Sequence, residues 1–295
     1  MEINDIYNGK TRAYGIIGNP VEHSFSPVLQ NTIAKKMGIN MAYLPFTVEK
    51  GCVKKALEGA YLLGFDGFNV TVPHKVEVIE SLKDIDPLAE KIGAVNTLKK
   101  VENGYKGYNT DILGLGKCLD IEGVEIKGKT VIVLGAGGAA KAAAVMAAVK
   151  EAAEIYIVNR TVEKAENIKK SLEKYYKGKV YAIGYDALYN IEKADCLINT
   201  TSAGMGDGNT YSVVEDKTFF KKVPFVVDIV YVPWETQIMK DASQMGAKAV
   251  NGFAMLIYQG IASFEIWHDI NIDNETAKEI KESLEKYYNG GKNGR

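Results

Sequence analysis

Short apolar runs alternate along the chain with segments in which apolar residues recur at every third or fourth position. The runs are typical of buried strands, and the periodic segments are typical of amphipathic helices. Their alternation indicates an α/β architecture with a parallel sheet. The expected strands are 13–17, 41–48, 67–72, 94–98, 105–108, 130–134, 155–158, 180–183, 196–199, 225–229 and 248–250. The expected helices are 27–37, 53–63, one that begins at 109–111, 138–149, 162–175, 234–245, 253–267 and 274–288.

The last two helices differ in pattern. Residues 253–267 are apolar almost all round, which predicts a buried helix. Gln259 interrupts that pattern and therefore requires a hydrogen-bond partner or a polar cleft. Residues 274–288 carry one helical stripe, formed by Ala277, Ile280, Leu284 and Tyr287, and a Gly- and Asn-rich tail follows at 289–295.

The length and composition limit the classes of protein to which the chain can belong. A chain of 295 residues reaches the size, about 250–300 residues, at which single cores stop growing, so two domains are expected. We place one boundary near 109–111 and a second near 251. The 36 Lys and Arg residues nearly balance the 37 Asp and Glu residues, for a net charge of −1. This balance gives no support to nucleic acid or an anionic membrane as the main partner.

Three scattered cysteines fit a reducing compartment, and the few His and Cys residues lack the spacing of metal ligands, so no metal site is expected. The polar amino terminus does not predict a secretory signal. The glycines and the lysine within 131–149 do not fit a membrane span. We therefore expect a cytoplasmic protein.

The clearest local pattern is a buried strand, 131–134, that leads into Gly-Ala-Gly-Gly-Ala-Ala at 135–140 and then into a helix. This order of strand, Gly-rich turn and helix predicts a dinucleotide site. Gly135 permits the tight turn, Gly137 lets the backbone approach a pyrophosphate, and Ala140 allows the helix to pack closely on the strand. The alternative is an α/β turn that binds no ligand.

The end of the next strand favours one nicotinamide cofactor over the other. An NAD site usually has an acidic residue there, whereas 155–158 is followed by Asn159, Arg160 and Thr161. Because a guanidinium can grip a 2′-phosphate with two hydrogen bonds, NADP is favoured. The alternative for Arg160 is a surface side chain beside a helix cap.

Several polar residues of the first domain have both a functional and a structural interpretation. Ser26 before Pro27 is expected to cap a helix, but capping does not account for Ser24, and the two hydroxyls form a plausible carboxylate site. Lys75 could be an ordinary surface lysine, and Asp111 could simply favour a helix amino terminus. Likewise, Asn96 and Thr97 could be polar residues at the end of a strand.

Together these segments resemble the shikimate dehydrogenase family over nearly the whole chain. The matching motifs, in order, are GNPxxHSFSP at 18–27, NVTVPHK at 69–75, GAVNT at 93–97, NTD at 109–111, GAGGAA at 135–140, NRT at 159–161, NTTSAGM at 199–205, DIVYVPWET at 228–236 and GFAMLIYQ at 252–259. The chain departs from the family at Gln30, where histidine is common, and at Phe253 and Ala254, where Leu-Gly is common.

The resemblance implies an open α/β substrate domain, formed by residues 1–110 and 252–295, and a Rossmann doubly wound NADP-binding domain, residues 111–251, with a cleft between them. It implies that Lys75 and Asp111 are catalytic. The substrate residues that it implies are Ser24, Ser26, Thr71, Asn96, Asp111, Tyr231 and Gln259. The NADP residues that it implies are Gly135, Ala136, Gly137, Gly138, Ala139, Asn159, Arg160, Thr161, Ile229 and Gly252.

The implied reaction is the reversible NADPH-dependent reduction of 3-dehydroshikimate to shikimate, a step in the biosynthesis of chorismate and the aromatic amino acids. Whether Lys75 transfers the proton or mainly positions the substrate stays open. Two alternatives also stay open: a quinate/shikimate dehydrogenase that uses NAD, and a non-catalytic NADP-binding sensor module. The expected partner is a small-molecule substrate, with no nucleic acid or membrane, and the protein is expected to be a monomer or a homodimer.

Overall fold

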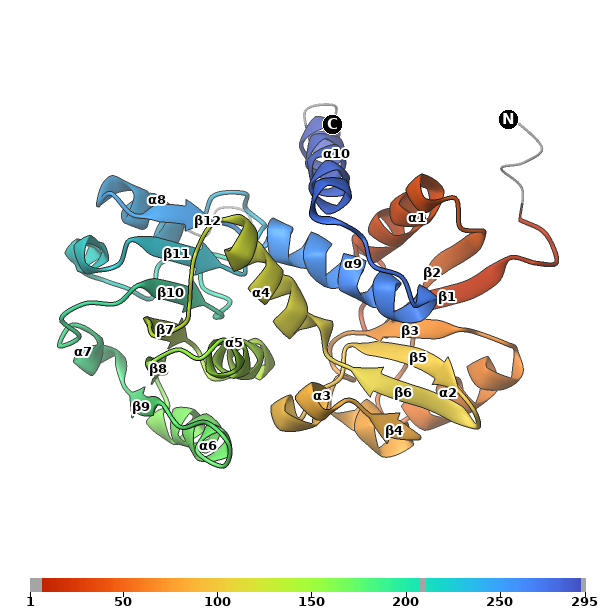
Figure 1. Ribbon diagram of the computed structural model, residues 1–295, viewed down its shortest axis with the longest axis horizontal. Coiled ribbons are helices and arrows are strands. Elements are labelled where there is room, and N and C mark those ends of the chain that lie inside the picture. The colour runs from red at the N-terminus through yellow and green to blue at the C-terminus, as the bar shows by residue number, and fades with distance from the viewer. Residues whose placement is uncertain (1–6, 207–210, 293–295) are drawn as a thin grey trace. The chain divides into compact units, whose positions relative to one another are not determined.

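The computed structural model describes residues 7–206 and 211–292 (Figure 1). Residues 1–6 of the polar amino terminus and residues 293–295 of the expected tail lie outside these ranges. The chain divides into two compact units. The first unit combines Met1–Thr110 with Ile257–Arg295, and the second is Asp111–Leu256. The later boundary therefore falls inside a helix, α9 (Phe253–His268), a few residues beyond the position near 251 that the sequence suggests.

The first unit is built on a mixed six-stranded sheet with the strand order β2-β1-β3-β5-β6-β4. Strand β1 pairs in parallel with β2 and β3, whereas β5 pairs in antiparallel fashion with β3 and β6, so the expectation of a parallel sheet is wrong for these strands. The strands are β1 (Arg12–Gly18), β2 (Met41–Thr47), β3 (Gly67–Val70), β4 (Asp84–Ile85), β5 (Thr97–Val101) and β6 (Gly104–Tyr108). Its helices are α1 (Ser26–Met37), α2 (Val53–Leu62), the 3-10 helix η2 (Glu77–Ser81), α3 (Pro87–Ile92) and α10 (Asn274–Lys292), together with most of α9.

Alternation along β3 separates the two faces of this sheet. Phe68 and Val70 point into an apolar cluster with Val53 and Leu57 of α2. Gly67 and Asn69 point to the opposite face, where Trp267 of α9 packs. A Cβ atom on Gly67 would lie 2.5 Å from the Trp267 Nε1 atom, so only glycine lets the indole approach this strand.

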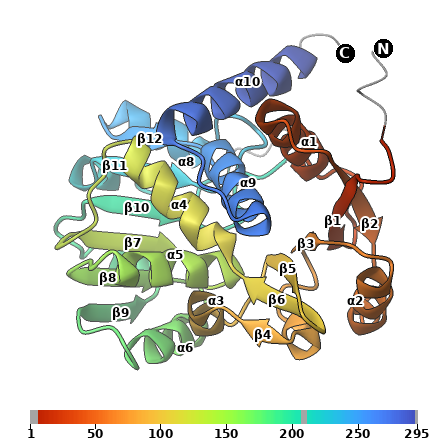
Figure 2. The same cartoon turned by 45° about the vertical axis from the view of Figure 1, so that its right-hand side comes forward.

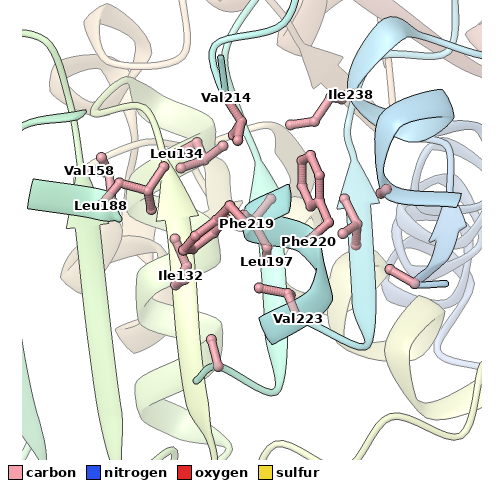
Figure 3. Close-up of a cluster of buried hydrophobic side chains, with 14 of the residues drawn as sticks. Ile132, Leu134, Val158, Leu188, Leu197, Val214, Phe219, Phe220, Val223 and Ile238 are labelled. Atoms are coloured by element: carbon pink, nitrogen blue, oxygen red, sulfur yellow. The ribbon is translucent and has the colours of Figure 1, made fainter. Parts of the chain in front are cut away.

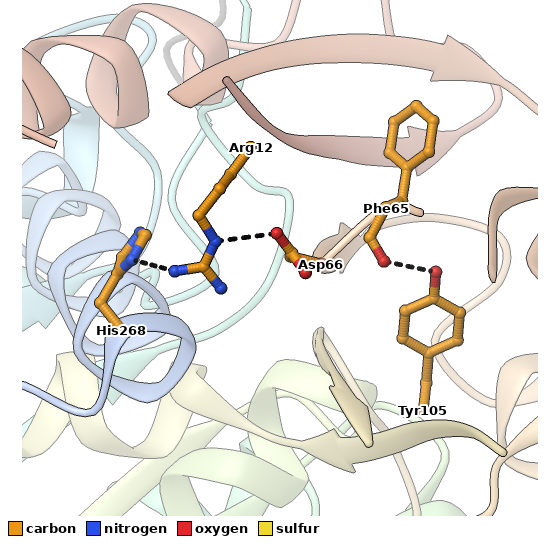
Figure 4. A network of polar contacts seen from close by, with 5 residues as sticks. All are labelled: Arg12, Phe65, Asp66, Tyr105 and His268. Atoms are coloured by element: carbon orange, nitrogen blue, oxygen red, sulfur yellow. Dashed lines mark hydrogen bonds and ion pairs between the residues drawn. The ribbon is translucent and has the colours of Figure 1, made fainter. Parts of the chain in front are cut away.

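Helix α9 is buried, as its apolar pattern predicts. The Trp267 Nε1–H donates to the Leu98 carbonyl oxygen at 2.9 Å. At the end of the helix, Arg12 of β1 donates to His268 Nδ1 at 3.2 Å and to Asp66 at 2.8 Å (Figure 4). Burial and the Arg12 charge lower the pKa of His268 to about 4, which keeps the imidazole neutral as an acceptor. These contacts tie the last helices of the chain to its first strand.

The second unit contains a six-stranded parallel sheet with the strand order β12-β11-β10-β7-β8-β9 (Figure 2). Numbered from β7, this is the doubly wound order 3-2-1-4-5-6 in reverse, and the order changes direction between β7 and β10. The strands are β7 (Thr130–Leu134), β8 (Glu154–Val158), β9 (Lys179–Ile183), β10 (Cys196–Asn199), β11 (Phe225–Asp228) and β12 (Lys248–Val250). Its helices are α4 (Thr110–Ile121, of which Thr110 belongs to the first unit), α5 (Gly138–Val149), α6 (Val162–Leu172), α7 (Tyr185–Leu188), the 3-10 helix η3 (Lys217–Lys222) and α8 (Gln237–Gln244).

One buried apolar cluster of the second unit supports the strands around this change of direction. Ile132 and Leu134 of β7 and Leu197 of β10 meet Phe219 and Phe220 of η3 there (Figure 3). Because both faces of a parallel sheet are covered, its strands are continuous apolar runs. This explains why the expected bounds of β7, β10 and β12 are confirmed.

Several expectations about element ends are wrong; α6, for example, ends at Leu172 rather than 175, and β3 ends at Val70 rather than 72. Helix α1 begins at Ser26, with Phe25 rather than Ser26 at the N-cap. Strand β5 begins at Thr97 rather than 94, because the Val95 N–H donates instead to the Lys75 carbonyl oxygen. Helix α8 begins at Gln237 rather than 234, with Thr236 at the N-cap and the Thr236 hydroxyl bonded to Asp228 instead of the helix.

Helix α10 keeps most of its expected stripe: Ala277, Ile280 and Leu284 are buried. Tyr287, however, is 63% exposed. Its ring lies 6.5 Å from that of Phe25, the residue before α1, so it packs at the edge of that helix rather than against its body. Across residues 7–206 and 211–292, none of the helices combines the length and the apolar composition that crossing a membrane requires.

Candidate active site

The turn between β7 and α5 has the geometry of a phosphate-binding loop. Gly135 has a φ of +108°, and a Cβ atom there would lie 2.6 Å from the Thr200 Oγ1 atom, so the turn requires glycine. Gly137 and Gly138 are different: both are exposed, and a Cβ atom on either would meet no atom of the described chain within 4 Å. The fold itself therefore gives no packing reason for glycine at these two positions.

The start of α5 completes this loop. Its N-cap, Gly137, has no side chain to accept the N–H groups of the first turn. Ala140 is fully buried, which confirms close packing of the helix on the sheet. Exposed backbone N–H groups at a helix amino terminus fit a pyrophosphate, and the missing side chains leave room for it, so this loop fits a dinucleotide.

A cavity of about 610 Å³ lies at the carboxyl ends of β8 and β10. Asn159 and Arg160 line it from the loop after β8, and Thr201 and Ser202 line it from the loop after β10. The adjoining Thr161 carbonyl accepts the Asn159 side-chain N–H at 2.9 Å, which orders the loop. The exposed Arg160 guanidinium is thus part of the cavity wall, where a 2′-phosphate could be bound.

Aromatic residues form another wall of this cavity. Nothing in the sequence marked them as site residues. Tyr185 of α7 and Tyr189, the residue after this helix, line it and pack against the apolar cluster beneath, and Tyr211 lines it from a later loop. Burial, together with the nearby Tyr211, raises the pKa of Tyr185 to about 12, so its hydroxyl stays protonated. The sequence does not predict the position of these rings, because the single turn of α7 is too short to show a periodic pattern.

A buried aspartate organises the loops that follow β10 and β11. Asp228 accepts hydrogen bonds from Asn199 at 2.9 Å, from the Val230 N–H at 3.1 Å and from Thr236 at 2.5 Å. Burial raises the pKa of Asp228 to about 6. The two residues that the sequence singles out in this loop, Ile229 and Tyr231, are thereby held between Asp228 and Thr236.

Gly252 packs against the same loop. A Cβ atom there would lie 1.9 Å from the Ile229 carbonyl oxygen, and the Gly252 N–H donates to Val230 at 3.1 Å. Two backbones thus approach closely at this point. Tyr231 is half-buried, and its ring lies 6.2 Å from that of Phe253, one of the residues that depart from the family pattern.

In the first unit, the two serines lie at the start of α1. The Ser24 hydroxyl accepts the Ser26 N–H at 3.2 Å, so Ser24 takes part in ordering the helix start. Ser26 is buried, and its hydroxyl lies near the hydroxyl of Tyr43. The Ser24 hydroxyl accepts in this bond, so its own O–H group is not used there and can donate to a ligand.

Lys75 follows a loop that is anchored on both sides. Before it, the Thr71 N–H donates to Ile17 at 2.9 Å, and His74 is fully buried with its Nε2 atom 2.7 Å from the Val48 carbonyl oxygen. At Lys75 itself, the backbone carbonyl accepts the Val95 N–H at 2.8 Å. The backbone of this half-buried lysine is therefore fixed beside the segment that carries Asn96.

Asn96 and Gln259 meet through Thr110. The Asn96 Oδ1 atom accepts the Thr110 N–H at 2.7 Å, and the Thr110 hydroxyl donates to Gln259 Oε1 at 3.4 Å. Asn96 therefore fixes the first residue of α4, and the half-buried Asp111 is the next residue in that first turn. Gln259 thus has the polar partner that its position in an apolar helix requires.

The described residues contain no group of His, Cys, Asp and Glu side chains that could hold a metal ion. Four polar residues beside Asn96 and Gln259 were not singled out, namely Tyr43, Asn69, Thr110 and Ser263, and Thr97 was considered only as a residue at the end of a strand. The sequence carried one signal for two of the four, because Asn69 and Thr110 lie inside the family motifs. Nothing in the sequence marked Tyr43 or Ser263.

Comparison with known proteins covers both units. The family model for the shikimate dehydrogenase substrate binding domain matches residues 16–98, and that for shikimate / quinate 5-dehydrogenase matches residues 119–240. The chain is 42% identical over 273 residues to the shikimate dehydrogenase (NADP(+)) of Methanococcus aeolicus, a match that covers 90% of this chain and 95% of the relative.

Solved structures agree in fold. A crystal structure of a shikimate dehydrogenase in complex with NADP⁺ matches with a TM-score of 0.86 at 38% identity, over 96% of this chain and 99% of the other. The shikimate 5-dehydrogenase of Listeria monocytogenes, in complex with shikimate and NAD, matches with a TM-score of 0.88 at 30% identity, over 94% of this chain and 98% of the other.

Proposed function

Since the chain belongs to the shikimate dehydrogenase family, we propose that it catalyses the reversible NADPH-dependent reduction of 3-dehydroshikimate to shikimate, in the biosynthesis of chorismate and the aromatic amino acids. The observation that carries this proposal is the match to a relative named shikimate dehydrogenase (NADP(+)) over 90% of this chain. The residues matched by the two family models include both the loop fitted to a dinucleotide and the segments around Lys75. The NAD-dependent quinate alternative is not favoured.

We assign the first unit, residues 1–110 with the returning carboxyl-terminal helices, to the substrate and the second unit to NADP. Ser24 and Ser26 are proposed to bind the substrate carboxylate. The residues proposed to hold the ring hydroxyls or line the substrate site are Thr71, Asn96, Asp111, Tyr231 and Gln259. The side chain of Asn96 is held in place, because its Oδ1 atom accepts the Thr110 N–H at 2.7 Å.

The pyrophosphate is proposed to lie on residues 135–139, where the Gly137 backbone is open. Arg160 is proposed to bind the 2′-phosphate, with Asn159 and Thr161 beside it. Ile229 and Gly252 are proposed to line the nicotinamide end, since Asp228 holds the loop that contains Ile229. When bound, NADPH supplies the hydride.

In the proposed reaction, side chains of the protein supply a positive charge and a proton. A carbonyl that is being reduced develops negative charge on its oxygen, and an adjacent ammonium stabilises that charge and donates a proton. We assign this role to Lys75, whose backbone is fixed by Val95, and we assign to Asp111 the orientation of the ammonium. The protein is proposed to act in the cytoplasm as a monomer or a homodimer.

The proposed function is tested by mixing the purified protein with shikimate and NADP⁺ and recording the NADPH absorbance. We expect the fastest NADPH formation with this pair, and slower reactions with quinate or with NAD⁺. Faster oxidation of quinate with NAD⁺ would replace the proposal by the other dehydrogenase. Tight NADPH binding without oxidation of any cyclic hydroxy acid would instead identify a sensor module.

Arg160→Ala is expected to lower kcat/KM for NADP⁺ by about 10- to 100-fold, because it removes charge-assisted hydrogen bonds to the 2′-phosphate. The value for NAD⁺, which lacks that phosphate, should stay close to wild type. Steady-state kinetics with both nucleotides measures the ratio. Lys179→Ala is the matched control, since Lys179 lies at the amino ends of the neighbouring strands β8 and β9, whereas Arg160 follows the carboxyl end of β8, and Lys179 pairs with Glu154. An unchanged NADP⁺/NAD⁺ ratio would contradict the assignment of Arg160.

A further inference from the structure

A buried carboxylate lies at the carboxyl end of β11, beside the residues proposed for the nicotinamide end. Asp228 is fully buried, and its hydrogen-bond partners Asn199, Val230 and Thr236 are all neutral. In the described part of the chain, no Lys, Arg or His side chain pairs with it. We propose that the negative charge of Asp228 raises the affinity of the second unit for the oxidised nicotinamide, which is a cation, relative to the reduced and neutral one. This inference rests on the proposed function.

The partners of Asp228 fit its ionised form. The Asn199 Oδ1 atom accepts the Thr201 N–H at 3.1 Å and the Thr201 hydroxyl at 2.8 Å, so the Asn199 Nδ2–H groups face Asp228, at 2.9 Å from Oδ1. The Val230 N–H, 3.1 Å from the same oxygen, can also only donate. The Thr236 Oγ1 atom lies 2.5 Å from Oδ2, a length typical of a hydroxyl that donates to a carboxylate.

Hydrogen bonding by itself does not require a charge at this position. The amide oxygen of an asparagine could accept from Asn199 and Val230 in place of Oδ1, and its N–H group could donate to the Thr236 hydroxyl in place of Oδ2. The charge is costly, because burial penalises an ionised carboxyl group and raises the pKa of Asp228 to about 6. A charge that the local structure does not need, and that no cation offsets, therefore points to a ligand.

Backbone contacts place this charge next to the proposed nicotinamide end. The Val230 N–H that Asp228 accepts belongs to the residue after Ile229, and the Ile229 N–H donates to the Asn199 carbonyl oxygen at 3.0 Å. The Gly252 N–H donates to the Val230 carbonyl oxygen at 3.1 Å. One continuous network thus joins the carboxylate to Ile229 and Gly252, at the carboxyl ends of the strands, where ligands bind in doubly wound sheets.

The two forms of the cofactor differ in a way that such a charge can distinguish. NADP⁺ and NADPH share the adenosine, the pyrophosphate and the 2′-phosphate, but only the oxidised ring carries a positive charge. A fixed negative charge near the ring therefore changes the ratio of the two affinities and leaves the shared contacts as they are. Ile229 and Gly252 carry no charge, so Asp228 supplies it. A charge in a buried, low-dielectric position is screened only weakly by salt.

The test compares three variants of the full-length protein with the wild type. Asp228→Asn removes the charge and keeps the shape of the side chain. Thr236→Val keeps the charge but removes one hydrogen bond. Asp195→Asn is the matched control: Asp195 precedes β10 at the amino ends of the strands, opposite Asp228, and its carboxylate accepts the Thr130 N–H at 2.9 Å. For each protein, the Kd values of NADP⁺ and NADPH are measured by calorimetry at pH 8, and Tm is recorded without cofactor.

We expect Asp228→Asn to weaken NADP⁺ binding by about tenfold, the order of magnitude for two unit charges that lie near one another without contact at an effective dielectric constant of about 20. NADPH binding should stay close to that of the wild type, so the ratio of the NADPH Kd to the NADP⁺ Kd falls by the same factor. Asp195→Asn and Thr236→Val should keep the wild-type ratio.

If Asp228→Asn does not fold, the wild type still decides the question. A carboxylate that faces a cation binds its proton less tightly, so NADP⁺ binding at pH 6.5 should release more protons than NADPH binding does. The 2′-phosphate is common to both cofactors, and none of the three groups that face Asp228 titrates in this range. Calorimetry in two buffers with different ionisation enthalpies measures the difference in proton release.

Equal losses of affinity for NADP⁺ and NADPH in Asp228→Asn would overturn the proposal, because Asp228 would then only hold the loop in place. An unchanged ratio, or equal proton release on binding of the two cofactors, would overturn it as well. Failure of the wild-type protein to bind either cofactor is a separate outcome, which overturns the proposed function and this inference with it.

Discussion

Lys75→Ala is expected to lower kcat for shikimate oxidation by about 10²- to 10⁴-fold, the usual contribution of general acid–base catalysis. The physical reason is that no ammonium then stabilises the charge on the reacting oxygen or exchanges its proton. The KM for shikimate should change much less than kcat, because the residues proposed to bind the substrate, among them Ser24, Asn96 and Gln259, remain. Steady-state kinetics with saturating NADP⁺ measures both values.

The matched control is Lys106→Ala, in the same unit. Lys106 is also half-buried, and it pairs with Asp84 at 2.8 Å, so its loss removes a charge of the same kind. Surface pairs of this sort are worth about 0–1 kcal/mol, and kcat should be unaffected. A kcat that survives Lys75→Ala would remove this residue from the chemistry, and a rise in KM alone would restrict it to substrate positioning.

Gly252→Ala is expected to destabilise the second unit and to weaken NADP⁺ binding at the same time. The added Cβ atom would lie 1.9 Å from the Ile229 carbonyl oxygen, a backbone atom that cannot swing aside. Moving Ile229 strains its N–H bond to the Asn199 carbonyl, which measures 3.0 Å. Overpacking of this kind costs about 1–3 kcal/mol, and more where backbone must move, so Tm should fall by several degrees.

Gly137→Ala provides the contrast, because its Cβ atom would meet no described atom within 4 Å. This variant should keep the wild-type Tm but lose NADP⁺ affinity, since its methyl group would occupy the proposed path of the pyrophosphate. Thermal unfolding, with and without NADP⁺, separates the two effects. If Gly137→Ala binds NADP⁺ with the affinity of the wild type, the pyrophosphate does not approach this residue.

The second unit is the part of the fold that the sequence predicts best. Its central strands β7 and β10 are mostly apolar because both faces of the sheet are covered there, so their boundaries are sharp in the sequence. In the first unit, Ala94 and Val95 are apolar as well, yet the N–H groups of Val95 and Asn96 donate to Lys75 and Tyr108, and this segment precedes the strand. Periodicity does not distinguish such an extended connection from a strand.

Helix caps and short elements depended on contacts that a sequence does not display. The two-residue strand β4 and the single turn of α7 are too short to carry a period. Thr236 is the N-cap residue of α8, yet its hydroxyl donates to the buried Asp228 and not to the helix. Tertiary hydrogen bonds thus overrode local preference at these positions.

For the candidate site, motifs mark the residues but not their hydrogen-bond partners. Asn96 and Asp111 stand out because they lie in the family motifs at 93–97 and 109–111. Ser263 does not, because a serine in an apolar helix has no distinguishing neighbours. Its hydroxyl lies 2.9 Å from that of Thr97, 166 positions earlier in the chain, and only the folded protein brings the two together.

The return of α9 to the first strands has a consequence for how the protein is made. Trp267 occupies the space that Gly67 leaves on β3, and Arg12 holds His268 at the end of the same helix. When only the first 110 residues have left the ribosome, Trp267, whose indole packs on this sheet, has not yet been synthesised. The nascent amino-terminal segment must wait, incompletely packed, while the whole nucleotide-binding unit is translated, and its refolding in isolation would require the last helices to be added in trans.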